Sequence, residues 1–326
     1  MQSNQQNKEF TPYGALKYFP VTLFSSIMGL SGLSIAYQRF EQLFSPNLGI
    51  GVVLLGLAYI VFLVVAASYL IKLIKYPAYV QEEFNHPIRA NFFATISIAL
   101  LLLSSGTANF SPGAAHLLWV IGTVLQFVFT IIILNRWIKR DYDIAHSNPG
   151  WFLPVVGNVI VPIAGVQFIH QELAWFFFWV GIFFWFVLFT VIFYRIVFHR
   201  QIADKFIPTL AIMIGPPSLG FLAYIQINEQ IDAFARCLLY VALFFVILLL
   251  SMSNTFMKLN FHVSWWAFTF PLCSITVAIL QAYKILGFPF LAWVATGLLG
   301  FATIVIALIT YKTIQSLLHN EVCVQE

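Results

Sequence analysis

The chain has 326 residues, of which 61% are hydrophobic and only 9% are charged. Soluble globular domains carry about 25% charged residues, so this composition excludes a soluble fold and predicts an integral membrane protein. The formal net charge of +4 does not indicate a nucleic-acid partner, because the basic residues fall in short loops between apolar stretches.

Ten apolar stretches follow one another, each close to the roughly 20 residues that a helix needs to cross a hydrocarbon core. We predict transmembrane helices at 18–43, 49–75, 88–108, 113–138, 152–169, 173–198, 206–227, 231–257, 263–284 and 289–314. The loops between them predict five helical hairpins in one transmembrane domain, 18–314. Residues 1–17 and 315–326 are expected to be short cytoplasmic tails.

The odd-numbered stretches differ from the even-numbered ones in their prolines. Prolines fall in or at the start of odd stretches, or in loops and at stretch edges, and never inside an even stretch. A proline inside a helix removes a backbone hydrogen bond and kinks the helix. At membrane depth, freed backbone groups are tolerated only where protein or a water-filled cavity covers them. We therefore predict an inner ring of kinked odd-numbered helices around a central pore, and an outer ring against lipid.

Small and hydroxyl residues sort with the prolines. For any single small residue, close packing of two helices is the simpler explanation, but the joint sorting favours a cavity. Asn158 fits pore lining and support of the kink equally well. The candidates for pore lining or kinking are Pro20, Ser26, Gly29, Thr95, Gly157, Asn158, Pro162, Pro216, Pro217, Ser218, Thr269, Pro271 and Ser274.

Lysine and arginine are distributed unequally between the two sides. Arg39, Arg236 and Lys284 lie on one side, and the others lie at the termini and in the even-to-odd loops. The positive-inside rule places this second side, with both termini, in the cytoplasm. All odd-numbered helices then run outward from the cytoplasm, where their partially positive N-terminal ends would attract anions.

Several charged residues lie near the ends of the predicted helices. We expect Glu82 and Glu83 to be loop acids, and Asp232 to pair with Arg236 on one helix face. Anchoring at the membrane interface is the alternative role for the basic residues, and it is strong for Arg89. The candidates for the pore entrance are His86, Arg89, Lys258 and His262.

No motif indicates catalysis. The seven histidines lie apart, and Cys237, Cys273 and Cys323 have no paired spacing, so neither a disulfide framework nor a zinc site is expected. The sequence has no HExxH pattern, nucleophile elbow or phosphate-binding loop. We expect no enzyme activity, no metal and no cofactor.

Four motifs resemble those of a known family. They are Asn-His-Pro-Ile-Arg-Ala-Asn-Phe-Phe at 85–93, Pro-Val-Val-Gly-Asn at 154–158, Pro-Pro-Ser at 216–218 and Trp-Trp-Ala-Phe-Thr-Phe-Pro at 265–271. In this order they resemble the tellurite-resistance/dicarboxylate transporter (TDT) family, which includes bacterial TehA and the plant guard-cell slow anion channel. The resemblance extends over all ten stretches.

The resemblance implies an all-α membrane protein of ten helices in five hairpins, with inner helices lining a pore in each protomer of a homotrimer. It also implies a phenylalanine in the ninth helix that plugs the pore, and the motif places it at Phe270. Composition alone would give this residue, one of 35 phenylalanines, a packing or lipid-facing role. The plant channels carry long phosphorylated tails, whereas the tails predicted here, 1–17 and 315–326, are short. We therefore do not expect kinase gating of the plant type here.

We therefore expect a multi-pass protein of the inner (plasma) membrane that passively conducts small monovalent anions such as chloride and nitrate. Weak binding by helix ends, hydroxyls and freed backbone groups suits fast passage. The alternative is a secondary transporter for dicarboxylate, sulfite or tellurite. A membrane-embedded enzyme or a structural subunit is the weakest hypothesis. The expected partners are small inorganic anions and the lipid bilayer.

Overall fold

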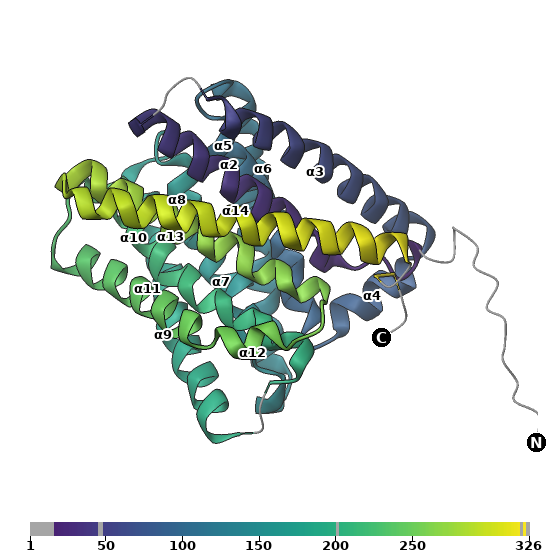
Figure 1. Cartoon of the computed structure of the whole chain (residues 1–326). Helices are drawn as coiled ribbons and strands as arrows, with labels where there is room; N and C mark the ends of the chain where they lie inside the picture. The colour runs from purple at the N-terminus through teal and green to yellow at the C-terminus, as the bar shows by residue number, and fades with distance from the viewer. Residues whose placement is uncertain (1–15, 45–47, 200–201, 320–321, 324–326) are drawn as a thin grey trace, which may run out of the picture.

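The computed structural model describes residues 16–44, 48–199, 202–319 and 322–323, and the regular structure in these residues is all helical. Residues 1–15 of the predicted N-terminal tail lie outside this part of the chain. The helices are arranged as five hairpins, each made of an inner span and a long outer helix (Figure 1).

The inner spans are η1 (Val21–Leu23) with α2 (Phe24–Phe44), η2 (Arg89–Phe93) with α5 (Ala94–Thr107), η6 (Asp204–Ile214) with α10 (Gly215–Asn228), and η7 (Val263–Phe268) with α13 (Thr269–Leu286). One further inner span consists of η4 (Pro149–Phe152), α7 (Leu153–Val156), η5 (Gly157–Val159) and α8 (Ile160–Gly165). The outer helices are α3 (Ile50–Lys75), α6 (Pro112–Lys139), α9 (Gln171–Phe198), α11 (Ala233–Ser251) and α14 (Pro289–Leu318).

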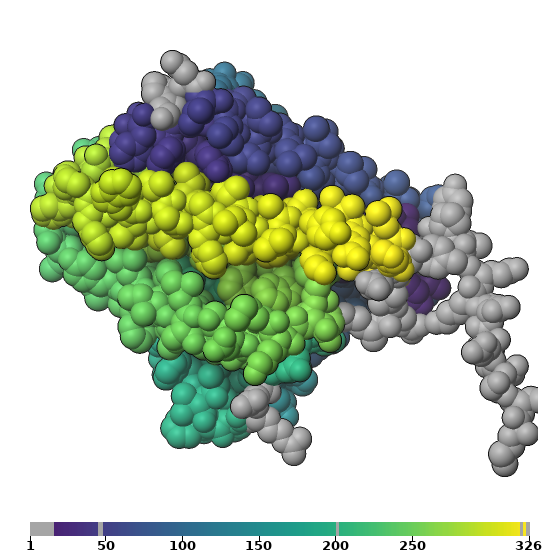
Figure 2. Space-filling view, in the orientation of Figure 1, coloured from purple at the N-terminus to yellow at the C-terminus, as the bar shows by residue number. Residues whose placement is uncertain are grey.

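The five inner spans close into a ring. Around the ring α2 contacts α5, α5 contacts α8, α8 contacts α10, α10 contacts α13, and α13 returns to α2. Each outer helix packs against its own inner partner and the next inner span, so that α3 contacts both α2 and α5. Figure 2 shows α14 crossing the outside of the molecule.

Burial separates the two rings. Nine helices in the described chain are long and apolar enough to cross a membrane. In the four inner helices, at least 72% of the most apolar 18-residue segment is buried. In the five outer helices, at most 39% of that segment is buried. An apolar surface of this extent on the outer helices can face only lipid or a partner. The predicted all-α membrane fold is confirmed.

The structure differs from the predicted helices at three places. The fifth predicted helix, 152–169, is a shorter apolar span, Pro149–Gly165, in four pieces. Pro154 and Pro162 each remove a backbone donor, which favours such breaks. The eighth, 231–257, divides into α11 and α12 (Ser253–Met257). An additional helix, α4 (Pro77–Asn85), precedes the third span; it is too short and too polar to resemble a membrane span.

Every inner span begins with a 3₁₀ segment at the same end of the ring. These segments rise about 2.0 Å per residue against 1.5 Å in an α-helix, and runs longer than four residues are uncommon. Here η6 has 11 residues with Pro208 inside it, and η7 has six. The ring is therefore stretched at this end and has regular α-helices at the other.

Candidate functional site

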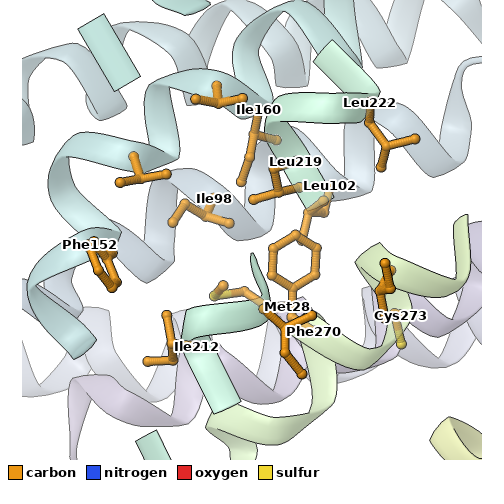
Figure 3. Close-up of a cluster of buried hydrophobic side chains, with 14 of the residues drawn as sticks. Met28, Ile98, Leu102, Phe152, Ile160, Ile212, Leu219, Leu222, Phe270 and Cys273 are labelled. Atoms are coloured by element: carbon orange, nitrogen blue, oxygen red, sulfur yellow. The ribbon is translucent and has the colours of Figure 1, made fainter. Parts of the chain in front are cut away.

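A cavity of about 700 Å³ lies inside the 3₁₀ end of the ring. All five inner spans contribute to its wall, as do α4 and the loops before the spans. Most of the wall is apolar; the deeper lining includes Met28, Ile98, Phe152, Ile160, Ile212, Leu219 and Phe270. Figure 3 shows Met28, Ile160 and Leu219 near the ring of Phe270, with Ile212 and Phe152 farther from it.

A second, much smaller cavity of about 40 Å³ lies farther along the inner helices. Its lining includes Gly32, Leu102, Ser105, Cys273 and Ser274. Three residues line both cavities: Ile160 of α8, Leu219 of α10 and Phe270 of α13. These three side chains therefore stand at the boundary between the two spaces.

The order of lining residues shows that the cavities are stacked along the ring axis. On α2 the large cavity touches Met28 and the small one touches Gly32; on α5 the corresponding residues are Ile98 and Leu102. The residues of each pair are four positions apart, which is just over one helical turn and about 6 Å along the helix axis. The wall passes from one cavity to the other within about one turn, at the level of Phe270.

The mouth of the large cavity carries more basic than acidic residues. The acidic residues are Glu82 and Glu83. Tyr18 and Tyr79 lie under the Lys17 ammonium, with its nitrogen 4.8 and 5.6 Å from the two ring centroids, and hydrogen bonding to Tyr18 raises the pKa of Lys17. The basic residues and histidines in the lining are Lys17, Lys72, Arg89, Lys205, His86, His146 and His262.

The sequence profile of the voltage-dependent anion channel family SLAC1 matches residues 18–314, which include all five inner spans and all five outer helices except the last four residues of α14. The chain belongs to this family.

Several curated proteins are similar to this SLAC1-family chain. The guard cell S-type anion channel SLAC1 of Arabidopsis thaliana is 28% identical over an alignment of 285 residues, which covers 83% of this chain and 51% of the plant protein. A tellurite resistance protein TehA homolog of Haemophilus influenzae is 27% identical, covering 92% of this chain and 94% of the relative. An uncharacterized transporter of Methanocaldococcus jannaschii is 27% identical, covering 87% and 90%. The predicted family is thus confirmed, and its members are anion channels and transporters.

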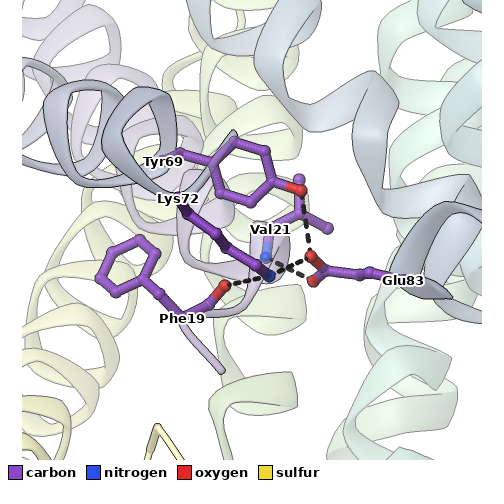
Figure 4. A network of polar contacts seen from close by, with 5 residues as sticks. All are labelled: Phe19, Val21, Tyr69, Lys72 and Glu83. Atoms are coloured by element: carbon purple, nitrogen blue, oxygen red, sulfur yellow. Dashed lines mark hydrogen bonds and ion pairs between the residues drawn. The ribbon is translucent and has the colours of Figure 1, made fainter. Parts of the chain in front are cut away.

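A buried ion pair joins the outer helix α3 to α4 at the cavity mouth (Figure 4) and contacts the start of the first inner span. Lys72 Nζ lies 2.6 Å from Glu83 Oε2 and donates to the Phe19 carbonyl at 2.8 Å. The other donors to the Glu83 carboxylate are the Tyr69 hydroxyl at 3.0 Å and the Val21 backbone N–H at 2.8 Å. Glu83 is therefore not the loop acid that we expected: it is 4% exposed and holds the first turn of an inner span.

The hydroxyl residues of the inner spans mostly bond to their own backbone. Ser26, Thr95, Thr269 and Ser274 each donate to the carbonyl three residues earlier, at 2.5–2.8 Å. Ser218 donates to the carbonyl four residues earlier. Such bonds satisfy backbone oxygens where the hydrogen-bond pattern changes from 3₁₀ to α.

The broken fifth span receives its hydrogen bonds from the outer helix α6. Gln126 Nε2 donates to the carbonyls of Leu153 and Pro154, and the Thr130 hydroxyl also donates to Pro154. Asn158 Nδ2 donates to Thr130 Oγ1 at 2.8 Å and to the Val155 carbonyl. The freed carbonyls are thus covered by protein, which is one of the two arrangements tolerated at membrane depth.

The structure divides the pore candidates into residues that line a cavity and residues that line neither cavity. Ser274 lines the small cavity, and Gly29 lies where helices meet: a Cβ there would be 2.3 Å from Thr269 Oγ1. The candidates that line the large cavity are Pro20, Gly157, Pro216, Phe270 and Pro271. Those that line neither cavity are Ser26, Gly29, Thr95, Asn158, Pro162, Pro217, Ser218 and Thr269.

Three of the entrance candidates, His86, Arg89 and His262, line the large cavity, whereas Lys258 does not. His86 Nδ1 accepts the backbone N–H groups of Ile88 and Arg89 and so caps the start of η2. Asp232 does not form the expected pair with Arg236 among the described residues. Instead it accepts from the Ala235 N–H at 2.9 Å and caps α11.

Sequence reasoning did not identify Ile160 and Leu219 as residues that line the two cavities, because an apolar residue in an apolar helix carries no signal of its own. Position offers one signal. Ile160 follows Gly157 by three residues, and Leu219 follows Gly215 by four; both glycines line the large cavity. Residues at these spacings share a helix face.

Proposed function

We propose that this protein is a channel for small monovalent anions, chloride and nitrate among them, and that the ring of Phe270 occludes its pathway. The observation that carries the proposal is the position of Phe270 between two cavities stacked inside a closed ring of five helices. An apolar constriction blocks ions because it excludes the water that would hydrate them.

Charge at the cavity mouth supports anions as the permeant species. Lys72 pairs with Glu83 at 2.6 Å, and the lining also contains the basic residues Lys17, Arg89 and Lys205 and the acidic residue Glu82. Basic residues at the mouth of a concave, largely apolar space raise the local concentration of anions. The N-terminal ends of the inner spans face the same space and favour negative charge.

Dehydration cost should then set the order of permeability. Along the constriction the wall offers apolar side chains, and the hydroxyl of Ser274 already donates to the Pro271 carbonyl. An anion that sheds water easily should pass more readily, so nitrate should be more permeant than chloride. Equal or reversed permeability ratios under bi-ionic conditions would count against this order.

The second candidate function is secondary transport of a dicarboxylate, sulfite or tellurite oxyanion. The volume of the large cavity, about 700 Å³, is compatible with secondary transport of an organic anion, because organic ligands occupy cavities of roughly 300–1,000 Å³. A carrier shows saturable flux and counter-flow, whereas a channel shows currents set by voltage and ion gradient. Flux assays with increasing substrate therefore separate the two.

Assembly and orientation form part of the same proposal. We place the large cavity and both termini at the cytoplasmic face of the plasma membrane, because most basic residues lie at that end. A homotrimer with one pathway per protomer is the expected assembly, and its protein mass of three times 37.0 kDa is measurable by light scattering in detergent.

The test is two-electrode voltage clamp of wild type and Phe270→Ala in chloride and in nitrate. We expect small wild-type currents and much larger anion currents in the variant. Phe183→Ala is the control, because Phe183 lies on an outer helix and is 61% exposed; it should behave as wild type. Silence of both wild type and Phe270→Ala, with equal surface expression, would refute the occlusion by Phe270.

A further inference from the structure

The boundary between the two cavities is formed by side chains from three inner spans. Ile160, Leu219 and Phe270 are the residues that line both spaces, and they come from α8, α10 and α13. Ile160 is 1% exposed, and Leu219 and Phe270 are 7% and 8% exposed. Removal of the Phe270 ring would leave two branched apolar side chains at the same level.

We propose that Ile160 and Leu219 form, with Phe270, a single three-residue constriction, and that they remain as a second barrier to ions when Phe270 is removed. This inference rests on the proposed function and assigns to Ile160 and Leu219 a role in the conduction of that pathway. It predicts that Phe270→Ala is only a partly open channel.

The contacts between the phenyl ring of Phe270 and α2 explain why Ile160 and Leu219 matter to the constriction. A Cβ built on Gly32 would lie 3.1 Å from Phe270 Cδ2 and 3.0 Å from Cys273 Cβ. The phenyl ring of Phe270 therefore rests against the backbone of α2 at Gly32, a residue that has no side chain to take its place. Ile160 and Leu219 line both cavities as Phe270 does, so they are placed to narrow the gap that the phenyl ring leaves.

Physical reasoning gives the direction of each effect. Dewetting depends on the width and the apolar character of a constriction, so shortening Leu219 or Ile160 should widen it and admit water. A larger side chain at the same level should narrow it again. Leu219→Ala mainly changes the width and Leu219→Asn mainly changes the apolarity, since asparagine has the same branched skeleton as leucine but carries an amide in place of the two methyl groups.

The electrical test uses variants on the Phe270→Ala background. Leu219→Ala, Ile160→Ala and Leu219→Asn should each raise the anion current several-fold over Phe270→Ala alone, and Leu219→Phe should lower it. Ile225→Ala is the matched control: Ile225 is buried on the same helix, α10, and lines neither cavity. Currents that stay equal to those of Phe270→Ala, at equal surface expression, would overturn the proposal.

A chemical readout keeps this test separate from conduction itself. Cys273 lines the small cavity and is 0% exposed, so an anionic methanethiosulfonate reagent applied from the large-cavity side must pass the constriction to reach it. In a Cys237→Ser/Cys323→Ser background, labelling in inverted vesicles should be slowest in wild type, faster in Phe270→Ala and fastest when Leu219→Ala is added.

The two readouts fail differently. Stepwise labelling without any current would support the constriction while refuting the anion channel. Labelling of Phe270→Ala as fast as that of the double variant would show that Phe270 alone closes the path, and would overturn the inference. Leu219→Phe guards against misfolding, because a variant that restores slow labelling to Phe270→Ala must be folded around the constriction.

Discussion

The buried pair of Lys72 and Glu83 allows a sharp test of the packing at the cavity mouth. Glu83→Gln keeps the shape of the side chain and one acceptor for the Val21 N–H, but it removes the charge that faces the Lys72 ammonium. Lys72 is 2% exposed, and its remaining described acceptor is the Phe19 carbonyl at 2.8 Å. An ammonium held this far from water without a carboxylate is strongly unfavourable.

The expected loss is about 3–5 kcal/mol of unfolding free energy, the usual cost of removing one partner of a buried ion pair. At roughly 2 °C per kcal/mol for a large chain, this corresponds to about 6–10 °C in Tm. The assay is thermal unfolding in one detergent, followed by the fluorescence of the nine tryptophans. Glu82→Gln is the control, because Glu82 is exposed on the same helix, and its Tm should not change.

The double variant Lys72→Met/Glu83→Gln tests the reason for the loss. If the cost comes from an unpaired ammonium, removing that ammonium should recover most of the Tm, and the two substitutions should be strongly non-additive. The reasoning is refuted if Glu83→Gln unfolds at the wild-type temperature. It is also refuted if the double variant is less stable than Glu83→Gln alone.

Three further predictions concern packing, hydrogen bonding and pH. Gly29→Ala should lower the unfolding free energy by about 1–3 kcal/mol, because the added Cβ would lie 2.3 Å from Thr269 Oγ1. Gly56→Ala should not lower it, because a Cβ at Gly56 has nothing within 4 Å. Thermal unfolding compares the two variants. Gln126→Leu should cost about 1–3 kcal/mol by the same measurement, because the carbonyls of Leu153 and Pro154 each lose one of their donors. Hydrogen bonds from the Ala235 N–H and the Tyr224 hydroxyl lower the pKa of Asp232. The stability that Asp232 contributes is therefore present above its unfolded pKa of about 3.9 and is lost as the pH falls through its folded pKa. The Tm values of wild type and Asp232→Ala, measured from pH 7 downward, should converge in acid.

The sequence was sufficient for the architecture because membrane helices obey strong one-dimensional constraints. Length and apolarity identify spans, and the sorting of prolines such as Pro154 and Pro208 distinguishes inner from outer helices. The fifth span shows the limit of this reasoning. Its two prolines predict a kink, but they do not predict that the span divides into four short pieces, which depends on Gln126 and Thr130 of a neighbouring helix.

The residues at the constriction could not be predicted in the same way. Leu219 and Ile225 lie on one helix, and nothing in their identity distinguishes a side chain at the cavity from one packed against other helices. Phe270 stood out through the family motif, not through composition. Glu83 was misassigned because its partner Lys72 belongs to the previous helix, and the short helix α4 that brings them together has no apolar signature.

The polar residues of the inner spans and the apolar wall of the cavity have a common cause. A 3₁₀ start leaves carbonyl oxygens to be satisfied where the α-helix takes over, and Thr95 and Thr269 use their hydroxyl protons for this purpose. Hydroxyls bound to their own backbone have no proton to offer an anion. Ser274, which lines the small cavity beside Phe270, likewise donates to the Pro271 carbonyl, so the proposed function leaves the attraction of anions to the basic mouth and the helix ends. Under the proposed function, an apolar constriction behind a basic vestibule would collect anions without holding them, and the rate of passage would depend on how wide Phe270 and its neighbours leave the path.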